Sequence, residues 1–459
     1  MEVIMDLPEK VIDEIADEIM AELEEAAERE GRKVTFDDIE KSLLLYRKKI
    51  GERMLQRSLD SVGTGKLEKK NVKIEGKKYT YKGIEPKKLI TLLGEGKLAR
   101  ARYRSETDDE WYPLDEELGL CRLKPSKRFA KVVNQLTIFM PEEHVKKQVK
   151  SILDIDISVT FISQVVTRFG NTLHRKMEDK AKRPYAIEER EKDVDVLYVE
   201  SDGAMTPLWG DHTREYKENK LGILFNNKDM VHKISKKGKE TTRITRKKFI
   251  SSIAEGAEPA RKMLFAAAVE KGYYAAKHVI FLCDGASWLT KCREKYFPKA
   301  IQILDWYHAV EHLWETAKAL YGDDDRRCKE WADPLIHLLW EGQVQKVIVR
   351  LEQMAVTMQK HQTVLYSLRT YYVGHADYMK YDEYRKNGWY IGSGAIESAN
   401  KYIVAQRLKQ SGMIWSKIGA DAMIWARCKY FEGDWDECWD NMKMTDFLDK
   451  QPTELAWAS

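Results

Sequence analysis

The chain has 459 residues, of which 43% are hydrophobic and 33% charged, and its net charge is +4 at pH 7. This length allows two or three domains with cores of their own, and the composition is that of a globular protein with a charged surface. Residues 1–40 hold 15 acidic and 4 basic side chains, net −11, so residues 41–459 carry +15. A basic body behind an acidic arm is compatible with a polyanionic partner, although a solvated surface has the same composition.

The sequence contains no sign of export, membrane insertion or disulfide bonding. No signal peptide opens the chain, and no apolar run reaches the roughly 18 residues that span a bilayer. The six cysteines form no CxxC pair, which argues against a disulfide framework and against a cysteine zinc site. We therefore expect a protein of the cytoplasm that makes no contact with a membrane.

The first part of the chain is predicted to be a helical arm followed by a small β unit. Apolar residues at helical spacing predict two amphipathic helices over residues 7–30 and 36–59, as a helical hairpin or a dimerisation arm. A glycine- and lysine-rich loop follows over residues 61–85. Weak alternation over residues 88–104 then predicts the small β unit.

A helical region is predicted over residues 126–192. Two of its helices, residues 141–153 and 159–169, are separated by a short break in which Ser158 is a good N-cap. Two short helices around such a break are typical of a helix-turn-helix, and its second helix, which ends near Arg168, would then contact DNA. Ordinary helical domains contain similar pairs, so the pattern leaves both interpretations open.

Two buried strands with the same ending form the centre of the predicted fold. Residues 194–202 read VDVLYVESD and residues 278–284 read HVIFLCD, and each run is followed by Gly-Ala. Apolar runs of this length predict strands of a mixed α/β sheet, together with a hairpin over residues 208–225 and a third strand over residues 300–304. The two endings would bring Asp202 and Asp284 side by side at the carboxyl edge, which suggests a metal site.

A third acidic residue follows a long helical stretch over residues 306–390. Glu397 lies in IGSGAIES, where the glycines permit close backbone approach and Ser393 can cap a helix. With Asp202 and Asp284 it would complete a set of hard oxygen ligands for Mg²⁺ or Mn²⁺. The alternative is an exposed helical glutamate without function.

Two further patterns lie on either side of this helical stretch. Asp305 is predicted to cap a helix that begins with Trp-Tyr-His308, and His308 together with Glu311 and His312 matches the HxxEH pattern of inverted zincins. Near the end of the chain, basic and aromatic side chains alternate in a way that suits DNA phosphates and unpaired bases. These candidate DNA contacts are Lys401, Arg407, Lys409 and Trp415. Their alternative role is a solvated helix face with aromatic residues in the core.

Five motifs in a fixed order give the chain a family resemblance. DGA, CDGAS, ILDWYHAVEHLW, IGSGAIES and AQRLKQSGMIWS resemble the DDE-type transposases of bacterial and archaeal insertion sequences, most of all the ISKra group and more distantly the ISLre group. The resemblance covers residues 88–430. Such transposases commonly carry a cysteine pair between the positions of Tyr103 and Pro113, where this chain has none. A zinc ribbon is therefore not expected here.

The resemblance implies both the fold and the role of the acidic residues. It implies an α/β fold with a ribonuclease H-like catalytic core, in which Asp202, Asp284 and Glu397 bind two Mg²⁺ or Mn²⁺ ions rather than zinc. It also places Asp305 and His308 beside the active site and makes the preceding helices an insertion. The expected regions are an arm (1–60), a β unit (61–125), a helix-turn-helix-like region (126–192), the first part of the core (193–305), the helical insertion (306–390) and the rest of the core (391–459).

The expected function is that of a DNA transposase. Its partners would be the terminal inverted repeats of its own element and target DNA, which it would cleave and join with the help of the metal ions. We expect at least a homodimer, because two ends must be brought together, and a cytoplasmic, nucleoid-associated location. The alternatives are an HxxEH zinc metallopeptidase, and a DNA-binding protein that is derived from a transposase and has no catalytic activity.

Overall fold

The chain was analysed as a computed structural model, which describes residues 9–74, 76–120, 123–188, 190–210, 213–234 and 240–445. It divides into two compact units. Of the described residues, the N-terminal unit contains those up to Leu136, Pro141–Ile162 and residues 442–445, and the C-terminal unit contains Thr137–Met140 and Ser163–Asn441. The helices of residues 126–192 are thus divided between the units rather than forming a region of their own.

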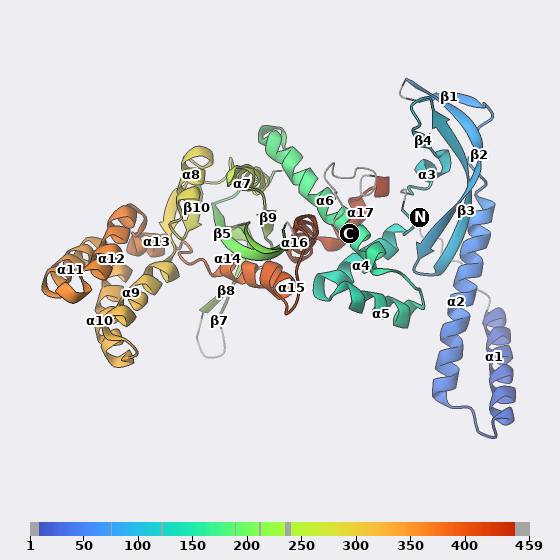
Figure 1. Cartoon of the computed structure of the whole chain (residues 1–459), viewed down its shortest axis with the longest axis horizontal. Helices are drawn as coiled ribbons and strands as arrows, with labels where there is room; N and C mark the ends of the chain where they lie inside the picture. The colour runs from blue at the N-terminus through green and yellow to red at the C-terminus, as the bar shows by residue number, and fades with distance from the viewer. Residues whose placement is uncertain are drawn as a thin grey trace. The chain divides into compact units, whose positions relative to one another are not determined.

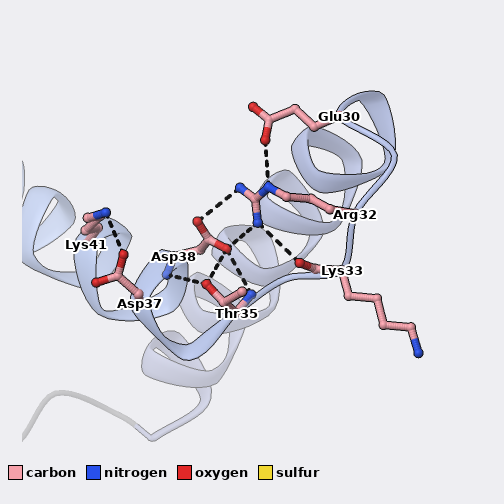
Figure 2. A network of polar contacts seen from close by, with 7 residues as sticks. All are labelled: Glu30, Arg32, Lys33, Thr35, Asp37, Asp38 and Lys41. Atoms are coloured by element: carbon pink, nitrogen blue, oxygen red, sulfur yellow. Dashed lines mark hydrogen bonds and ion pairs between the residues drawn. The ribbon is translucent and has the colours of Figure 1, made fainter.

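The N-terminal unit begins with the predicted pair of helices, α1 (Glu9–Arg29) and α2 (Phe36–Ser61). The turn between them is fixed by a polar network (Figure 2). Thr35 caps α2: its Oγ1 accepts from the Asp38 backbone N–H (3.3 Å), and the Asp38 carboxylate accepts from the Thr35 backbone N–H (2.9 Å). Arg32 donates to both carboxylate oxygens of Asp38, at 2.5 and 3.1 Å. This capping box stops α1 from continuing into α2 and confirms the predicted break.

The small β unit is an antiparallel sheet of four strands in the order β1-β2-β3-β4. Alternate residues of β3 are buried, and Leu89, Leu98 and Leu114 form its core. The prediction of a β unit is confirmed, but the expected loop over residues 61–85 is wrong in its second half, because β1 pairs with the start of β2 there. The elements are β1 (Asn71–Ile74), β2 (Lys77–Thr91), β3 (Gly94–Ser105), β4 (Glu110–Trp111) and α3 (Pro113–Glu117).

Three helices follow: α4 (Lys127–Phe139), α5 (Glu142–Leu153) and α6 (Val159–Lys182). The predicted break between α5 and α6 is confirmed. Asp154 ends α5 in the left-handed conformation (φ 51°), and the Ser158 hydroxyl accepts from the Phe161 backbone N–H at 3.1 Å. The second helix of the pair is much longer than predicted, at 24 residues, because its apolar face continues into the C-terminal unit.

The C-terminal unit is built on a five-stranded mixed sheet in the order β11-β10-β5-β6-β9 (Figure 1). β10 is parallel to both β5 and β11, whereas β5, β6 and β9 are antiparallel neighbours. The sheet packs on a buried core to which α7 contributes most of its residues. These elements are β5 (Val196–Trp209), β6 (Arg214–Asn226), β9 (Lys248–Ser252), α7 (Glu258–Glu270), β10 (His278–Cys283), α8 (Ser287–Tyr296) and β11 (Ile301–Leu304).

The predicted mixed α/β sheet is confirmed, with one correction to its first strand. β5 does not end at Asp202 but continues to Trp209, because β6 pairs with it from Leu197 to Trp209. A separate two-stranded hairpin, β7 (Met230–Ile234) and β8 (Glu240–Ile244), lies between β6 and β9 in the chain. Short 3₁₀ turns occur at Pro184–Ala186, Asn227–Asp229, Gln359–His361 and Ala376–Tyr378.

The rest of the C-terminal unit is helical. Helices α9 to α12 pack against one another as a bundle, drawn from golden yellow to orange in Figure 1. Within the helical stretch predicted over residues 306–390, Gly342, whose φ is 67°, separates α10 from α11. Among the described residues, no helix combines the length and apolar character needed to cross a membrane. The helices are α9 (Trp306–Tyr321), α10 (Asp325–Trp340), α11 (Val344–Thr357), α12 (Gln362–His375), α13 (Tyr381–Lys386), α14 (Gly394–Ala399), a π-helical segment (Asn400–Ala405), α15 (Gln406–Leu408), α16 (Lys417–Glu432) and α17 (Trp435–Asn441).

Candidate active site

The parallel pairing of β5 with β10 directs the two predicted aspartates to the same edge of the sheet. The strands pair in parallel from Val196 with His278 to Glu200 with Leu282. Continued by two residues, this register would bring Asp202 opposite Asp284, and the charge of Asp284 does act on the Asp202 carboxyl. β10 ends at Cys283 while β5 continues along β6, so this position is an edge where β5 has lost its parallel neighbour. The two carboxylates therefore share one open edge of the sheet.

These carboxylates line a cavity of 790 Å³. Its walls come from the middle of β5, the end of β10 and the residue after it, one side of α9, and α14 with its N-cap. The candidate site residues on its walls are Asp202, Asp284, His308 and Glu397. Segments up to 195 residues apart in the sequence thus converge on a single space.

Asp202 is partly buried and lies near a second negative charge, that of Asp284. Its Oδ2 accepts from the Asn400 side-chain amide at 2.7 Å, and its Oδ1 accepts from the Gly203 backbone N–H at 2.6 Å. Burial raises the pKa of Asp202, and the nearby charge of Asp284 raises it further. Asp284 accepts from the Ala286 backbone N–H at 2.9 Å. Two carboxylates that repel each other in a partly buried space would be stabilised by a cation.

Glu397 reaches the cavity from α14, and a carboxylate of strand β5 holds this helix to the sheet. The Ser393 hydroxyl donates to Glu397 Oε1 at 2.5 Å. The next residue toward the N-terminus, Ile396, donates its backbone N–H to Glu200 Oε2 at 3.1 Å. Glu200 is fully buried, and burial, opposed in part by this hydrogen bond and reinforced by the charges of Asp305 and Glu397, raises its pKa to about 8. Glu200 therefore ties the helix that carries the third acid to the strand that carries the first.

Asp305 caps α9, as predicted, and lies near the candidate site. It caps α9 by accepting from the His308 backbone N–H at 2.7 Å, and it also accepts from the Ser393 backbone N–H at 2.5 Å. The side chain is buried, and burial raises its pKa. Asp305 thus joins the start of α9 to the turn before α14, which places the side chain next to the cavity without lining it.

His308 and His312 lie close together on α9, with ring centroids 5.2 Å apart. Each ring has an acidic neighbour on the same helix: His308 Nδ1 is 3.7 Å from Glu311, and His312 Nδ1 is 3.1 Å from Glu315. His308 lines the cavity and lies near enough to Asp202 for its charge to lower the pKa of that carboxyl. The helix thus offers two imidazoles on one face, as the HxxEH pattern predicts.

Sequence reasoning missed three residues of this site: Glu200, Asn400 and Tyr371. Glu200 lies two residues before Asp202 on the same strand, which was a usable signal, because alternate strand residues share a face. Asn400 reaches Asp202 from a π-helical segment, a local irregularity that is often found at functional sites and that composition does not reveal. Tyr371 of α12 donates its hydroxyl to the Asp284 backbone carbonyl at 3.3 Å. No sequence pattern joins these two residues.

The candidate DNA contacts near the end of the chain have different environments. Lys401 and Lys409 are exposed. The assignment of Arg407 is wrong for this structure: its side chain is 1% exposed, donates to the Thr137 carbonyl at 3.0 Å and lies over the Trp415 ring at 4.7 Å. Trp415 is half-buried, and its backbone carbonyl accepts from the Trp209 N–H at 2.8 Å, so its packing is structural. Arg168 is half-buried on α6.

The donor chemistry of the cavity fits a hard divalent cation. Asp202, Asp284 and Glu397 all supply carboxylate oxygens, which Mg²⁺ and Mn²⁺ prefer, and their mutual repulsion favours a cation between them. Within the described residues, however, no three acidic, histidine or cysteine side chains already converge as a ligand set. A bound ion would have to compete with the hydrogen bonds that Asn400 and Ser393 make to these carboxylates.

Comparison with known proteins assigns the chain to a family. The model for the family described as "Uncharacterised protein family (UPF0236)" matches residues 29–444, so the chain belongs to this family. One relative, the "UPF0236 protein in vanSb 3′region" of Streptococcus gallolyticus, is 23% identical over 358 residues, which cover 74% of this chain and 72% of the relative. All of the candidate site residues lie within the segment that the family model matches.

Proposed function

We propose that this protein is a DDE-type transposase, with a ribonuclease H-like core in which Asp202, Asp284 and Glu397 are the three catalytic acids. The observation that carries the proposal is that Asp202, Asp284 and Glu397 line one cavity, at the edge toward which the parallel strands β5 and β10 run. The sequence resemblance names the same three residues. The mixed sheet supports the fold assignment, because three antiparallel strands are extended by two parallel ones and the third acid comes from a later helix.

The three acids would bind two Mg²⁺ or Mn²⁺ ions. When bound, such ions activate the attacking oxygen and neutralise the charge that develops on the leaving oxygen of a phosphodiester. The role of the remaining residues is to orient the carboxylates: Asn400 holds Asp202, Ser393 holds Glu397, and Asp305 fixes the turn before α14. His308 faces the cavity and can donate or accept a proton there.

The reaction is a pair of displacements at phosphorus. Water first attacks a phosphodiester at the end of the element, and the bond from phosphorus to the 3′ oxygen breaks, which leaves a 3′-hydroxyl. That hydroxyl then attacks a phosphodiester of the target DNA and displaces another 3′ oxygen. Each displacement breaks one phosphorus–oxygen bond and forms another, so no external energy source is needed. Because two ends must react together, we propose a homodimer or larger assembly, with terminal inverted repeats and target DNA as partners.

The proposal is tested with duplex DNA that carries the ends of the element encoding this chain. The full chain, incubated with this DNA and Mg²⁺, should nick the strand at the element's terminus, and Glu397→Gln should remove nicking while DNA binding is retained. Absence of nicking with any terminal sequence would contradict the proposal. Zinc-dependent peptide hydrolysis that is lost in His312→Ala would instead support the HxxEH metallopeptidase. DNA binding without any cleavage would support a DNA-binding protein without catalytic activity.

A further inference from the structure

A second cavity lies on the other side of α14 from the candidate active site. Ser393, Ile396 and Glu397 of this segment line the active-site cavity, whereas Gly394, Ala395 and Ser398 line the second one. Its volume is 610 Å³, and its other walls come from β8 and the residues after it, from Tyr390, and from Tyr402 and Phe431. We refer to it as the α14 groove. A helix with its side chains is about 10–12 Å wide, so the groove is a short distance from the acids.

The two cavities differ in charge. The active-site cavity is lined by five acidic residues: Asp202, Asp284, Glu311, Glu315 and Glu397. The described residues that line the α14 groove include the basic residues Arg243 and Lys247 and no aspartate or glutamate. A nucleic-acid backbone is repelled by the first surface and attracted by the second. A nucleic acid that approaches the acidic cavity is therefore attracted by neighbouring basic surfaces such as this groove, and not by the cavity itself.

Lys247 is held in place at the wall of the groove. Its ammonium donates to the Tyr402 hydroxyl at 3.3 Å and lies 5.5 Å from the centre of that ring. Burial lowers the pKa of Lys247, Glu200 opposes this, and the charge of Arg243 lowers it further. Two cations that repel each other on one wall are stabilised by an anion between them, which is the electrostatic counterpart of the paired carboxylates on the far side of α14.

Two tyrosine side chains of the groove are fixed by packing against neighbouring aromatic rings. Tyr402 packs against Phe431 with ring centroids 4.7 Å apart, and Tyr390 packs edge-on against Tyr198 at 6.4 Å. The Tyr390 backbone N–H also donates to the Tyr198 hydroxyl at 3.3 Å. Rings that are held rigidly lose little entropy when a base stacks on them, and such stacking contributes about 1–3 kcal/mol per base.

We propose that the α14 groove binds an unpaired stretch of the DNA strand beside the cleavage site, with its phosphates at Arg243 and Lys247 and a base against Tyr390 or Tyr402. This inference rests on the proposed transposase function. A space of 610 Å³ is within the range of pockets that enclose small molecules, so it can hold a nucleotide or two but not a duplex. Ser398 adds a hydroxyl that can donate to a phosphate.

The test compares two DNA substrates with the full chain. Both carry the same terminal duplex, and one has in addition an unpaired extension on the strand that is to be cut. Arg243→Glu reverses an exposed charge in the groove, and Ser398→Asp places a negative charge on its opposite wall. Arg326→Glu is the control, because it reverses a charge that is 88% exposed on α10, outside the groove. Fluorescence anisotropy over a series of salt concentrations gives the affinities, and melting curves confirm that the variants fold.

For the extended DNA, Arg243→Glu and Ser398→Asp should each weaken binding about tenfold or more. The salt dependence of log K should also become less steep by about 0.7 for each phosphate that the protein no longer neutralises, as for single strands. Binding of the blunt duplex should change less than twofold, and Arg326→Glu should leave both substrates unaffected. Equal losses on both DNAs, or no loss on either, would overturn the groove proposal. Failure of the unmodified chain to bind either DNA would instead overturn the proposed function.

Discussion

The arm and the candidate active site both contain acidic side chains, but the surroundings of these side chains shift their pKa values in opposite directions. Asp38, in the turn between α1 and α2, is held by the Arg32 guanidinium and by Thr35, which keep the pKa of its carboxyl well below the usual range (Figure 2). Asp202, Asp305 and Glu200 have no such cation as their main neighbour, and burial raises the pKa of each of them. In the arm, a cation compensates the charge of the carboxylate, whereas near the cavity burial is the largest influence on each carboxyl group.

This difference separates a structural use of carboxylates from a functional one. The Asp38 network is local, since all of its members lie between Glu30 and Lys41, and it fixes one turn. The carboxylates that line the cavity come from distant segments, namely β5, the residue after β10, α9 and α14. Negative charge in a cavity is costly unless a cation or a proton compensates it, which is why we propose this cavity, and not the arm, as the site of catalysis.

The largest expected effect is on DNA nicking. Asp202→Asn, Asp284→Asn and Glu397→Gln should each lower the nicking rate on the order of 10³-fold or more, because loss of a ligand removes several kcal/mol of charge stabilisation. DNA binding, measured by anisotropy, should remain within about twofold of the unmodified chain. Asp38→Asn is the matched control, since it removes the same charge from the arm and should leave nicking unchanged. Full activity in any of the three site variants would remove that residue from the catalytic set.

The next effect concerns Glu200, which we regard as a positioning residue. Glu200→Ala removes the acceptor for the Ile396 N–H and should lower nicking about 10–100-fold, as is usual for residues that orient metal ligands. Glu200→Gln keeps an acceptor oxygen and should restore most of the activity. If both variants lost activity equally while their melting temperatures matched that of the parent, the role of this hydrogen bond would be disproved.

One further carboxylate, that of Asp421, is partly buried and also has a basic partner, His174. Asp421 of α16 is 2.5 Å from His174 Nδ1 in a partly buried contact. Burial lowers the pKa of His174, but the charge of Asp421 and the hydrogen bond to it outweigh burial, so the pKa is raised. A raised histidine pKa stabilises the fold below the ordinary histidine pKa of 6.5, and this contribution is lost as pH rises through the folded-state value.

Asp421→Asn should therefore destabilise the protein by about 1.5–3 kcal/mol at pH 6, the usual contribution of a hydrogen bond to a charged group, and by less at pH 9. Urea unfolding at several pH values measures the difference. A loss of stability that does not change with pH would show that His174 is neutral in the folded protein.

The smallest effect concerns the arm. Thr35→Ala removes the N-cap of α2 and should destabilise that helix by about 1 kcal/mol. Faster amide hydrogen exchange in the first turn of α2 would report it. Lys41→Ala on the same helix is the control, because Lys41 only pairs with Asp37 at the surface. Nicking should be unaffected in both variants. A catalytic defect in Thr35→Ala would mean that the arm contributes more than structure.

Much of this architecture follows from local patterns. Apolar runs and caps located α1, α2, α5, β10 and the start of α9 to within a few residues, because each is determined by its own spacing and its own terminal residues. The end of β5 was placed wrongly because strand length depends on the partner, and the pairing of β6 beyond Asp202 is not written in β5 itself.

The residues of the candidate site also fall into two groups, those that stand in sequence motifs and those that only the fold brings together. Asp202, Asp284 and Glu397 stand in motifs, so the sequence could propose them. Glu200, Asn400 and Tyr371 act through contacts between distant segments, so only the fold brings them into view. Arg407 shows the converse: a basic residue among aromatic ones suggests a DNA contact, but its guanidinium is buried against a backbone carbonyl and an indole ring.

The central claim is that the carboxylates of the cavity bind a divalent cation, and Mn²⁺ binding tests it most directly. Electron paramagnetic resonance measures the free Mn²⁺ that remains when the full chain, together with DNA carrying the element's end, is titrated with the ion. The unmodified chain should bind Mn²⁺, whereas Asp202→Asn and Asp284→Asn should each weaken this binding about tenfold or more. Asp38→Asn should bind as the unmodified chain does. Equal Mn²⁺ binding by all four proteins would contradict the assignment of the metal site to Asp202 and Asp284.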